Sequence, residues 1–346
     1  MRKRIALALW LALLLAGVPR LPAQEQEQRQ EQGRQQLPPP DAPQPAGVLW
    51  SDPGDITSRD LYYGPGGEAR RPRGVMTFVK EDMAGTSPKF DVVDEEGTKW
   101  KVKLGVEAAP ETVASRLLWA VGYTTDEEYF VADLQVQGLP ARLRRGQKYV
   151  GRDGHVRNAR LKRAPQDMKK SGQWKWKENP FEGTREFDGL RVMMAVLNNW
   201  DLKDSNTAIY ADRSDPAQQT FIVSDLGASF GTNGRSLRQQ KGKGNLASYG
   251  RSQFITRVDD EYVDFATPGS PSAILFFELP DFVSREQMRW IGHRVSRSHA
   301  RWMGDLLAQL SPEQIRDAFR AGGYSPRQAD AFARIVEERI AQLEQL

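Results

Sequence analysis

Two short polar stretches, 199–206 and 224–227, carry the residue types that phosphoryl transfer needs. The first places Asp201, Lys203 and Asn206 in a D-x-K-x-x-N spacing, and in the second Asp225 begins a D-x-G. A carboxylate can orient an attacking hydroxyl, a lysine can neutralise the transferred phosphate, and amide and carboxylate oxygens can hold Mg²⁺. A bare D-x-x-x-x-N arises by accident roughly once in a chain of this length. The added lysine and the nearby D-x-G favour a functional interpretation.

The sequence before these motifs is typical of a small sheet followed by one helix. Trp100, Val102 and Leu104 alternate with lysines, so a strand here places the lysines together on the opposite face. A segment with apolar residues three or four positions apart follows and ends at a glycine, as a helix does. The expected strands are 75–79, 90–93, 100–104 and 129–136, and the expected helix is 110–122.

The elements after this sheet would bring the two motifs together. Apolar residues at Phe187, Leu190, Met194 and Leu197 predict a helix that leads directly to Asp201. Two short strands, expected at 207–210 and 220–223, then form a hairpin that ends at the D-x-G. From residue 284 onward the apolar spacing predicts mainly helices.

This order of parts resembles that of atypical protein kinases. The chain is similar to the HipA-type serine/threonine kinases and, more distantly, to phosphoinositide-kinase folds, on Lys103, Glu111, Asp201, Asn206 and Asp225. The resemblance implies an α+β, two-lobed, protein-kinase-like fold with a small antiparallel β lobe and a larger, mainly helical lobe. We expect the first lobe at 48–138 and the second at 139–346, with Gly138-Leu139-Pro140 as the joint.

The resemblance also implies ATP and Mg²⁺, or Mn²⁺, as cofactors. Lys103 would contact the α- and β-phosphates and be held by Glu111. Each role has a plainer alternative, because Lys101 shares the same strand face and Glu111 could simply favour the start of a helix.

Two glycines and two metal ligands complete the expected nucleotide site. Gly64 and Gly66 could cover the phosphates, since glycine lets backbone amides approach an anion, but an ordinary turn explains them equally well. In the resemblance Asp201 and Lys203 are catalytic, while Asn206 and Asp225 are the metal ligands.

Three functions are compatible with these residues. The leading one is ATP-dependent phosphoryl transfer to a hydroxyl of an unidentified protein or small molecule. A pseudokinase that binds a partner without catalysis, and a nucleotidyl transferase that uses the same site for AMPylation, are the alternatives.

The N-terminal sequence predicts export. Basic residues at 2–4, an apolar run at 5–18 and a small residue at Ala23 are typical of a secretory signal over 1–23, and 24–47 has the Gln- and Pro-rich composition of a disordered linker. Export would be to the periplasm or the medium of a bacterium. No later segment is apolar enough to cross a membrane.

Removal of 1–23 takes away four basic residues and no acid, so the net charge becomes +4 − 4 = 0. Nucleic acid is therefore not an expected partner.

Composition excludes some chemistry and leaves two basic segments open. The chain has no cysteine and three histidines, so disulfides and thiolate sites are absent and a histidine metal site is disfavoured. The segment 142–177, which contains Trp174 and Trp176, is read as a solvated insert or a surface for an acidic partner. The segment 235–257 could contact an acidic substrate or phosphate.

Overall fold

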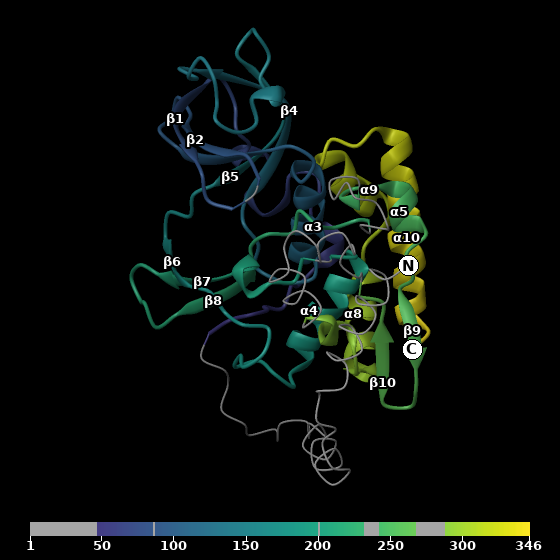
Figure 1. The fold of residues 1–346 in the computed structure, drawn as a ribbon. Coiled ribbons are helices and arrows are strands. Elements are labelled where there is room, and N and C mark those ends of the chain that lie inside the picture. The colour runs from purple at the N-terminus through teal and green to yellow at the C-terminus, as the bar shows by residue number, and fades with distance from the viewer. Residues whose placement is uncertain (1–46, 86, 200, 232–241, 268–287) are drawn as a thin grey trace, which may run out of the picture. The chain divides into compact units, whose positions relative to one another are not determined.

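Apolar and polar residues alternate along β3 (Lys99–Leu104), and the apolar ones contribute to the core of a β-barrel. Trp100, Val102 and Leu104 point into an apolar core, and the strand pairs with β2 on one side and β5 on the other. In this computed structural model the strands close in the order β1-β2-β3-β5-β4. Figure 1 labels β1, β2, β4 and β5 of this barrel. Neighbours are antiparallel except β1 and β4, which pair in parallel. The remaining strands are β1 (Met76–Asp82), β2 (Lys89–Val93), β4 (Glu128–Gln137) and β5 (His155–Arg163).

The structure describes residues 47–85, 87–199, 201–231, 242–267 and 288–346. All of them belong to one unit defined by backbone contacts, Pro43–Leu346. The predicted signal segment at 1–23, nearly all of the predicted linker at 24–47, and Trp200 lie outside the described residues.

The barrel confirms the four expected strands, and its strand order bears on the joint expected at 138–140. The sheet is antiparallel in four of its pairings, as expected, and it closes on itself through the parallel pairing of β1 and β4. The joint expected at 138–140 falls inside the barrel, because β5 comes after it and pairs with both β3 and β4. A boundary at 138 would separate β5 from the two strands with which it pairs in the barrel. The chain leaves the barrel at 164–167.

Helix α3 (Ala108–Ala120) follows β3 and is buried on nearly every side. Val113 and Leu117 are fully buried, and each contributes roughly 1.5–3 kcal/mol by leaving water. Val121 ends the helix, and Gly122 follows with a positive φ of 98° in a space where a Cβ would strike the backbone of Ser51. The helix contacts β4, β5 and α9, so it connects the barrel to the helical part of the chain.

A small sheet and one helix flank the D-x-K-x-x-N and D-x-G motifs. β6 (Met168–Gly172), β7 (Thr207–Asp212) and β8 (Gln219–Val223) form a three-stranded sheet in the order β6-β7-β8. The two expected strands of the hairpin correspond to β7 and β8. The expected helix is α4 (Arg185–Val196), which begins where the Thr184 hydroxyl accepts a hydrogen bond from the Phe187 amide.

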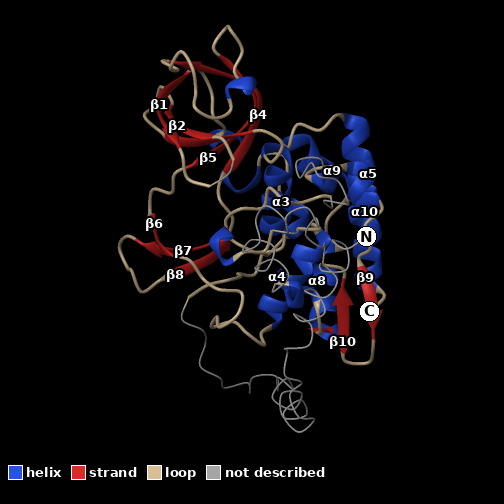
Figure 2. Cartoon of the chain, in the orientation of Figure 1, coloured by secondary structure: helices blue, strands red, loops and turns tan. Residues whose placement is uncertain are grey.

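The C-terminal part is mainly helical, as predicted. Ser311 and Ser325 each form a capping box with the glutamine three residues later, which satisfies backbone amides at two helix starts. The described residues hold six α-helices, and Figure 2 distinguishes them from the strands by colour. The remaining ones are α5 (Leu246–Gly250), α8 (Arg297–Leu307), α9 (Pro312–Ala321) and α10 (Pro326–Glu344).

Short strands and 3₁₀ turns complete the described chain. A second three-stranded sheet has the order β11-β10-β9. Its strands are β9 (Ile255–Val258), β10 (Tyr262–Phe265) and β11 (Val295–Ser296). The 3₁₀ turns are η1 (Ile56–Ser58), η2 (Gly64–Gly66), η3 (Glu68–Arg70), η4 (Gln147–Tyr149), η5 (Asp204–Asn206) and η7 (Arg289–Gly292). Among the described helices, none combines the length and the apolarity that a membrane span requires.

Two separate apolar cores support the site. The barrel has its own core, which includes Phe90, Val102 and Leu161. A larger core joins α3 and α4 to the C-terminal helices and contains Leu117 and Phe332. The fold is therefore mixed α+β, with the predicted motifs carried by elements of both cores.

Candidate active site

A buried lysine at the end of β3 contacts three carboxylates. Lys103 Nζ lies 2.8 Å from Glu111 Oε2 and 3.1 Å from Asp225 Oδ1. The same nitrogen lies 2.7 Å from Glu107 Oε2. The expected contact between Lys103 and Glu111 is therefore present, and Lys103 also reaches the D-x-G motif. Sequence analysis did not assign Glu107, which directly precedes α3.

The contacts among these side chains keep Lys103, Glu107 and Asp225 in their charged forms. Burial by itself lowers the pKa of Lys103, but the carboxylates of Glu111, Asp225 and Glu107 outweigh it, and the pKa of Lys103 is raised. Burial raises the pKa of Asp225 and of Glu107, and in both cases the Lys103 ammonium overcomes this effect and holds the pKa below its ordinary value. Lys103, Glu107 and Asp225 are therefore charged at neutral pH.

Arg160 on β5 holds Glu111 from its other side. Arg160 Nη2 donates to Glu111 Oε1 at 2.8 Å, and Arg160 Nη1 lies 3.4 Å from Glu128 Oε1. The Ser115 hydroxyl donates to Glu128 Oε2 at 2.9 Å. All four side chains are buried. Burial raises the pKa of Glu128 to about 7, against the opposing effect of Arg160. Register across β3 and β5 creates this chain of contacts, which spacing in the sequence does not show.

The D-x-K-x-x-N loop is fixed by its own amides. Asn199 Oδ1 accepts from the Asp201 amide at 2.9 Å, and Asn206 Nδ2 donates to the Asp201 carbonyl at 2.7 Å. The Asn206 carbonyl accepts from the Ser224 amide at 2.8 Å, which joins the loop to the start of the D-x-G motif. Lys203 Nζ lies 3.7 Å from Asp201 Oδ1. The structure thus brings the two predicted motifs side by side.

The arrangement of Asn206 and Asp225 suits a divalent cation. Because Asn206 Nδ2 donates to the Asp201 carbonyl, Oδ1 is the atom of this amide that can coordinate a cation. Asp225 Oδ1 accepts from the Gly227 amide at 3.3 Å, and the Asp225 side chain is 44% exposed, against 3% for Lys103. Within the described ranges no three His, Cys, Asp or Glu side chains are grouped for a metal. One carboxylate and one amide oxygen fit Mg²⁺, which commonly takes its other ligands from water and substrate phosphates.

The predicted glycines are placed away from this cluster. Gly64 and Gly66 form the turn η2, where a Cβ would strike the Arg116 guanidinium and the Tyr129 hydroxyl respectively. Their small size therefore serves close packing against α3 and β4, in line with the plainer alternative. A role for them in covering phosphates has no geometric support here.

A different glycine-containing turn lies beside Lys103. Lys89 of β2 pairs with Lys103 of β3, so the described residues of the β1–β2 connection, 83–85 and 87–88, reach the same end of the barrel. In this turn Gly85 has a φ of 65°, and the Ser87 hydroxyl donates to Glu107 Oε2 at 2.7 Å. Sequence analysis missed this turn because only strand register shows that it reaches Lys103.

A basic cavity lies next to the cluster. It has a volume of about 570 Å³ and is bounded by β1, β2, β3, the 164–167 connection and β7. Ser224, the neighbour of Asp225, lines it, whereas Lys103 and Asp225 are not among its lining residues. One acidic side chain, Asp91, and six cationic side chains line the cavity. The six are Lys80, Lys99, Lys101, Lys162, Arg163 and Lys170. Four of these cations pair with acids, namely Lys80 with Asp91, Lys101 with Asp82, Lys162 with Asp126 and Arg163 with Glu127. Lys99 and Lys170 supply the remaining positive charge for an anionic ligand.

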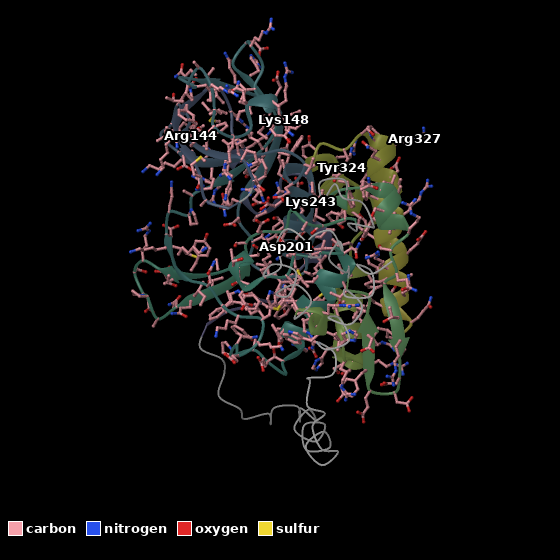
Figure 3. All side chains as sticks on the ribbon, in the orientation of Figure 1. Arg144, Lys148, Asp201, Lys243, Tyr324 and Arg327 are labelled. Atoms are coloured by element: carbon pink, nitrogen blue, oxygen red, sulfur yellow. The ribbon has the colours of Figure 1, made fainter. Side chains whose placement is uncertain are left out.

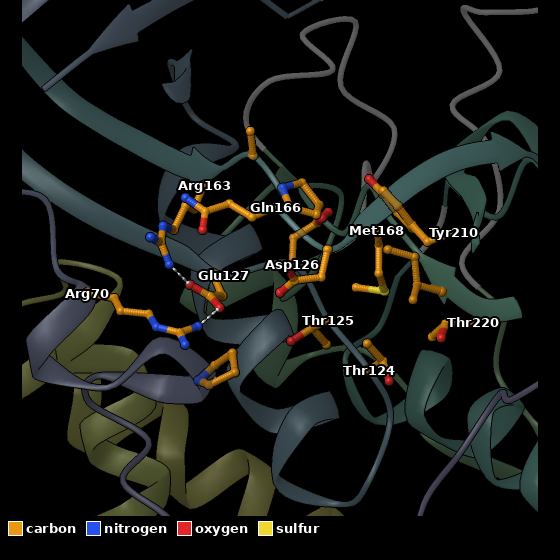
Figure 4. Close-up of a pocket in the computed structure, with 15 residues that line it drawn as sticks. Arg70, Thr124, Thr125, Asp126, Glu127, Arg163, Gln166, Met168, Tyr210 and Thr220 are labelled. Carbon is orange, nitrogen blue, oxygen red and sulfur yellow. Dashed lines mark hydrogen bonds and ion pairs between the residues drawn. The ribbon is translucent and has the colours of Figure 1, made fainter. Parts of the chain in front are cut away.

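A second cavity of about 270 Å³ lies beside the same connection and is less suited to an anion (Figure 4). Arg163 and Tyr210 line both cavities. In the second, Arg70 and Arg163 both face Glu127, and Asp126 and Asp167 add further negative charge. Charge therefore favours the first cavity for a triphosphate.

The two basic segments are partly structural. Within 142–177, Arg160 and Trp176 are buried, so the expected solvated insert was wrong for its strand and its tryptophans. In the second segment, 235–241 lies outside the described residues, while Lys243 forms an ion pair with Glu107 Oε1. Figure 3 labels Lys243 together with Asp201.

No family model and no curated protein matches this chain. Among solved structures, the chain is similar to a proinflammatory kinase, CtkA, from Helicobacter pylori. The two are 9% identical, the match covers 79% of this chain and 98% of that one, and the TM-score is 0.41.

Proposed function

We propose that the chain is an ATP- and Mg²⁺-dependent phosphotransferase with a two-lobed, kinase-like arrangement of the HipA type. The observation that carries this proposal is the contact of Lys103 Nζ with both Glu111 and Asp225, which lie 8 and 122 residues away in the chain. A lysine held by a helix carboxylate and facing the aspartate of a D-x-G is the arrangement that phosphoryl transfer uses.

Each residue has a definite role in this proposal. Lys103 binds phosphate oxygens, and Glu111 keeps its ammonium in place. Asp225 and Asn206 Oδ1 hold the cation. Asp201 orients the acceptor hydroxyl and takes its proton, while Lys203 balances negative charge on the phosphoryl group.

Bound Mg²⁺–ATP would supply a phosphoryl group activated by the cation. The chain itself would provide position and electrostatic complementarity, which are the main contributions of protein to this reaction. The phosphates would lie at Lys103, and the adjoining basic cavity beside Ser224 is the place we assign to the rest of the nucleotide.

The acceptor is an alcohol of a protein or a small molecule. From the N-terminal sequence we further propose that the chain acts outside the cytoplasm, in the periplasm or the medium. Both statements rest on the residues of the sequence alone.

Label transfer from ATP tests the proposal. The full-length chain is incubated with Mg²⁺ and ATP labelled in the γ position or, separately, in the α position. Incorporation of the γ label that is lost in Asp225→Asn supports a phosphotransferase. Incorporation of the α label would instead establish nucleotidyl transfer. Nucleotide binding without transfer of either label, to the chain or to added protein hydroxyls, would support the pseudokinase.

A further inference from the structure

Glu107 connects four separate segments of the candidate site. Its Oε2 lies 2.7 Å from Lys103 Nζ and accepts from the Ser87 hydroxyl, also at 2.7 Å. Its Oε1 forms the ion pair with Lys243, which lies beyond the D-x-G. A Cβ on Gly227 would lie 2.7 Å from Glu107 Cβ, so the glycine of the D-x-G packs directly against this side chain.

The groups around the Glu107 carboxylate are those of a phosphate site. Two ammonium groups and a hydroxyl converge on it, from β3, from the segment after the D-x-G and from the β1–β2 turn. Lysine ammoniums and serine hydroxyls bind phosphate oxygens by the same charge-assisted hydrogen bonds. A carboxylate and a phosphate therefore compete for this set of donors.

We propose that the Glu107 carboxylate occupies the position of a nucleotide phosphate, and that Lys243 and Ser87 bind this phosphate once Glu107 has moved away. The proposal rests on the proposed function, since it places the triphosphate of the same site. It makes Glu107 an internal competitor and adds two phosphate ligands that the sequence motifs do not contain.

Of the three carboxylates around Lys103, Glu107 is the one whose side chain can move away. Its side chain is 12% exposed, against 1% for Glu111, which Arg160 also holds. Glu107 precedes the first turn of α3 and its side chain caps no backbone amide there. Its departure therefore breaks no helix contact, whereas departure of Glu111 would leave Arg160 buried without a main partner. Asp225 is excluded as the competitor because the proposed function requires it at the cation.

Calorimetric titration with inorganic triphosphate and Mg²⁺ tests this inference without the base of a nucleotide. We expect Glu107→Gln to bind triphosphate roughly tenfold more tightly than the wild-type chain, because no internal anion must be displaced. Glu96→Gln, in the exposed β2–β3 turn, is the matched control and should leave the affinity unchanged. Glu107→Asp, which is too short to reach both lysines, should shift the affinity in the same direction if the glutamine variant does not fold.

Lys243→Met is then added to Glu107→Gln, where the ion pair between Lys243 and Glu107 is already absent. Weaker triphosphate binding in the double variant supports Lys243 as a phosphate ligand, and equal binding contradicts it. Equal or weaker triphosphate binding by Glu107→Gln than by wild type overturns the competition.

Titration with Mg²⁺–ATP separates the two proposals. If ATP binds wild type and Glu107→Gln equally, only this inference fails. If triphosphate binds the variant more tightly but ATP does not bind either chain, only the proposed function fails.

Discussion

Lys103 Nζ lies 3.1 Å from Asp225 Oδ1, although 122 residues separate the two positions. The contact fixes the end of a barrel strand against the D-x-G that follows β8. Asp225 in turn neighbours the loop of Asp201, because the Asn206 carbonyl accepts from the amide next to it. One lysine thus brings the barrel to the loop that carries the remaining catalytic-type residues.

Arg160 should be a determinant of stability. In Arg160→Met, Glu111 and Glu128 lose a buried cation, and breaking such a pair typically costs about 3–5 kcal/mol. Denaturant unfolding measures this loss. Arg157→Met is the matched control on the same strand, because the Arg157 side chain is 55% exposed and its ion pairs are worth little. An Arg160 variant as stable as the Arg157 variant would contradict the role of the buried network.

Glu128 should make stability depend on pH near neutrality. Burial raises the pKa of Glu128 from 4.5 to about 7, so the folded chain keeps a proton that the unfolded chain releases. The free energy of unfolding should therefore fall as pH rises from about 4.5 to about 7, by up to about 3 kcal/mol, and level off above this range. Thermal unfolding between pH 5 and 8 measures the effect, and Glu128→Gln should flatten it.

The lowered pKa values of Glu107 and Asp225 act in a different range. Their contributions to stability are present above the unfolded-state pKa values, near 4, and are lost as pH falls further. A slope between pH 5 and 7 that persists in Glu128→Gln would therefore have another source, and the assignment to Glu128 would be wrong.

Asn206 has two functions that two substitutions can separate. Asn206→Asp keeps an oxygen for the cation but loses the donor to the Asp201 carbonyl, whereas Asn206→Ala loses both. We expect label transfer to fall in both variants, with Mg²⁺-dependent nucleotide binding reduced more strongly in Asn206→Ala. Loss of one neutral hydrogen bond should cost about 1 kcal/mol of stability in either variant. Identical nucleotide affinities would show that Asn206 does not hold the cation.

Local patterns sufficed for most elements and for one part of the site. Alternation along 99–104 indicated that Lys103 leaves the barrel core, and helical spacing placed Glu111 on α3, so their contact could be expected. The motifs around Asp201 and Asp225 are close in sequence and joined by a hairpin, which limits how far apart they can lie. The roles of these residues stay predictions until activity is measured.

The pairing of strands in the folded chain brings together residues that the sequence does not show to be neighbours. Arg160 sits opposite Lys103 only because β5 pairs with β3, and the same pairing closes the barrel beyond the boundary expected at 138. Gly64 and Gly66 resembled a phosphate loop in composition, yet their turn packs on Arg116 and Tyr129. Glu107 had no motif around it, because two of its partners, Ser87 and Lys243, come from distant segments.

Titration of the full-length chain with ATP, in the presence and absence of Mg²⁺, tests the central claim most directly. The account predicts Mg²⁺-dependent binding to wild type that is strongly weakened in Lys103→Met and in Asp225→Asn, and retained in Asp260→Asn, an exposed control. Folded wild-type chain that does not bind ATP at millimolar concentration, or that binds it equally well in all three variants, would contradict the claim.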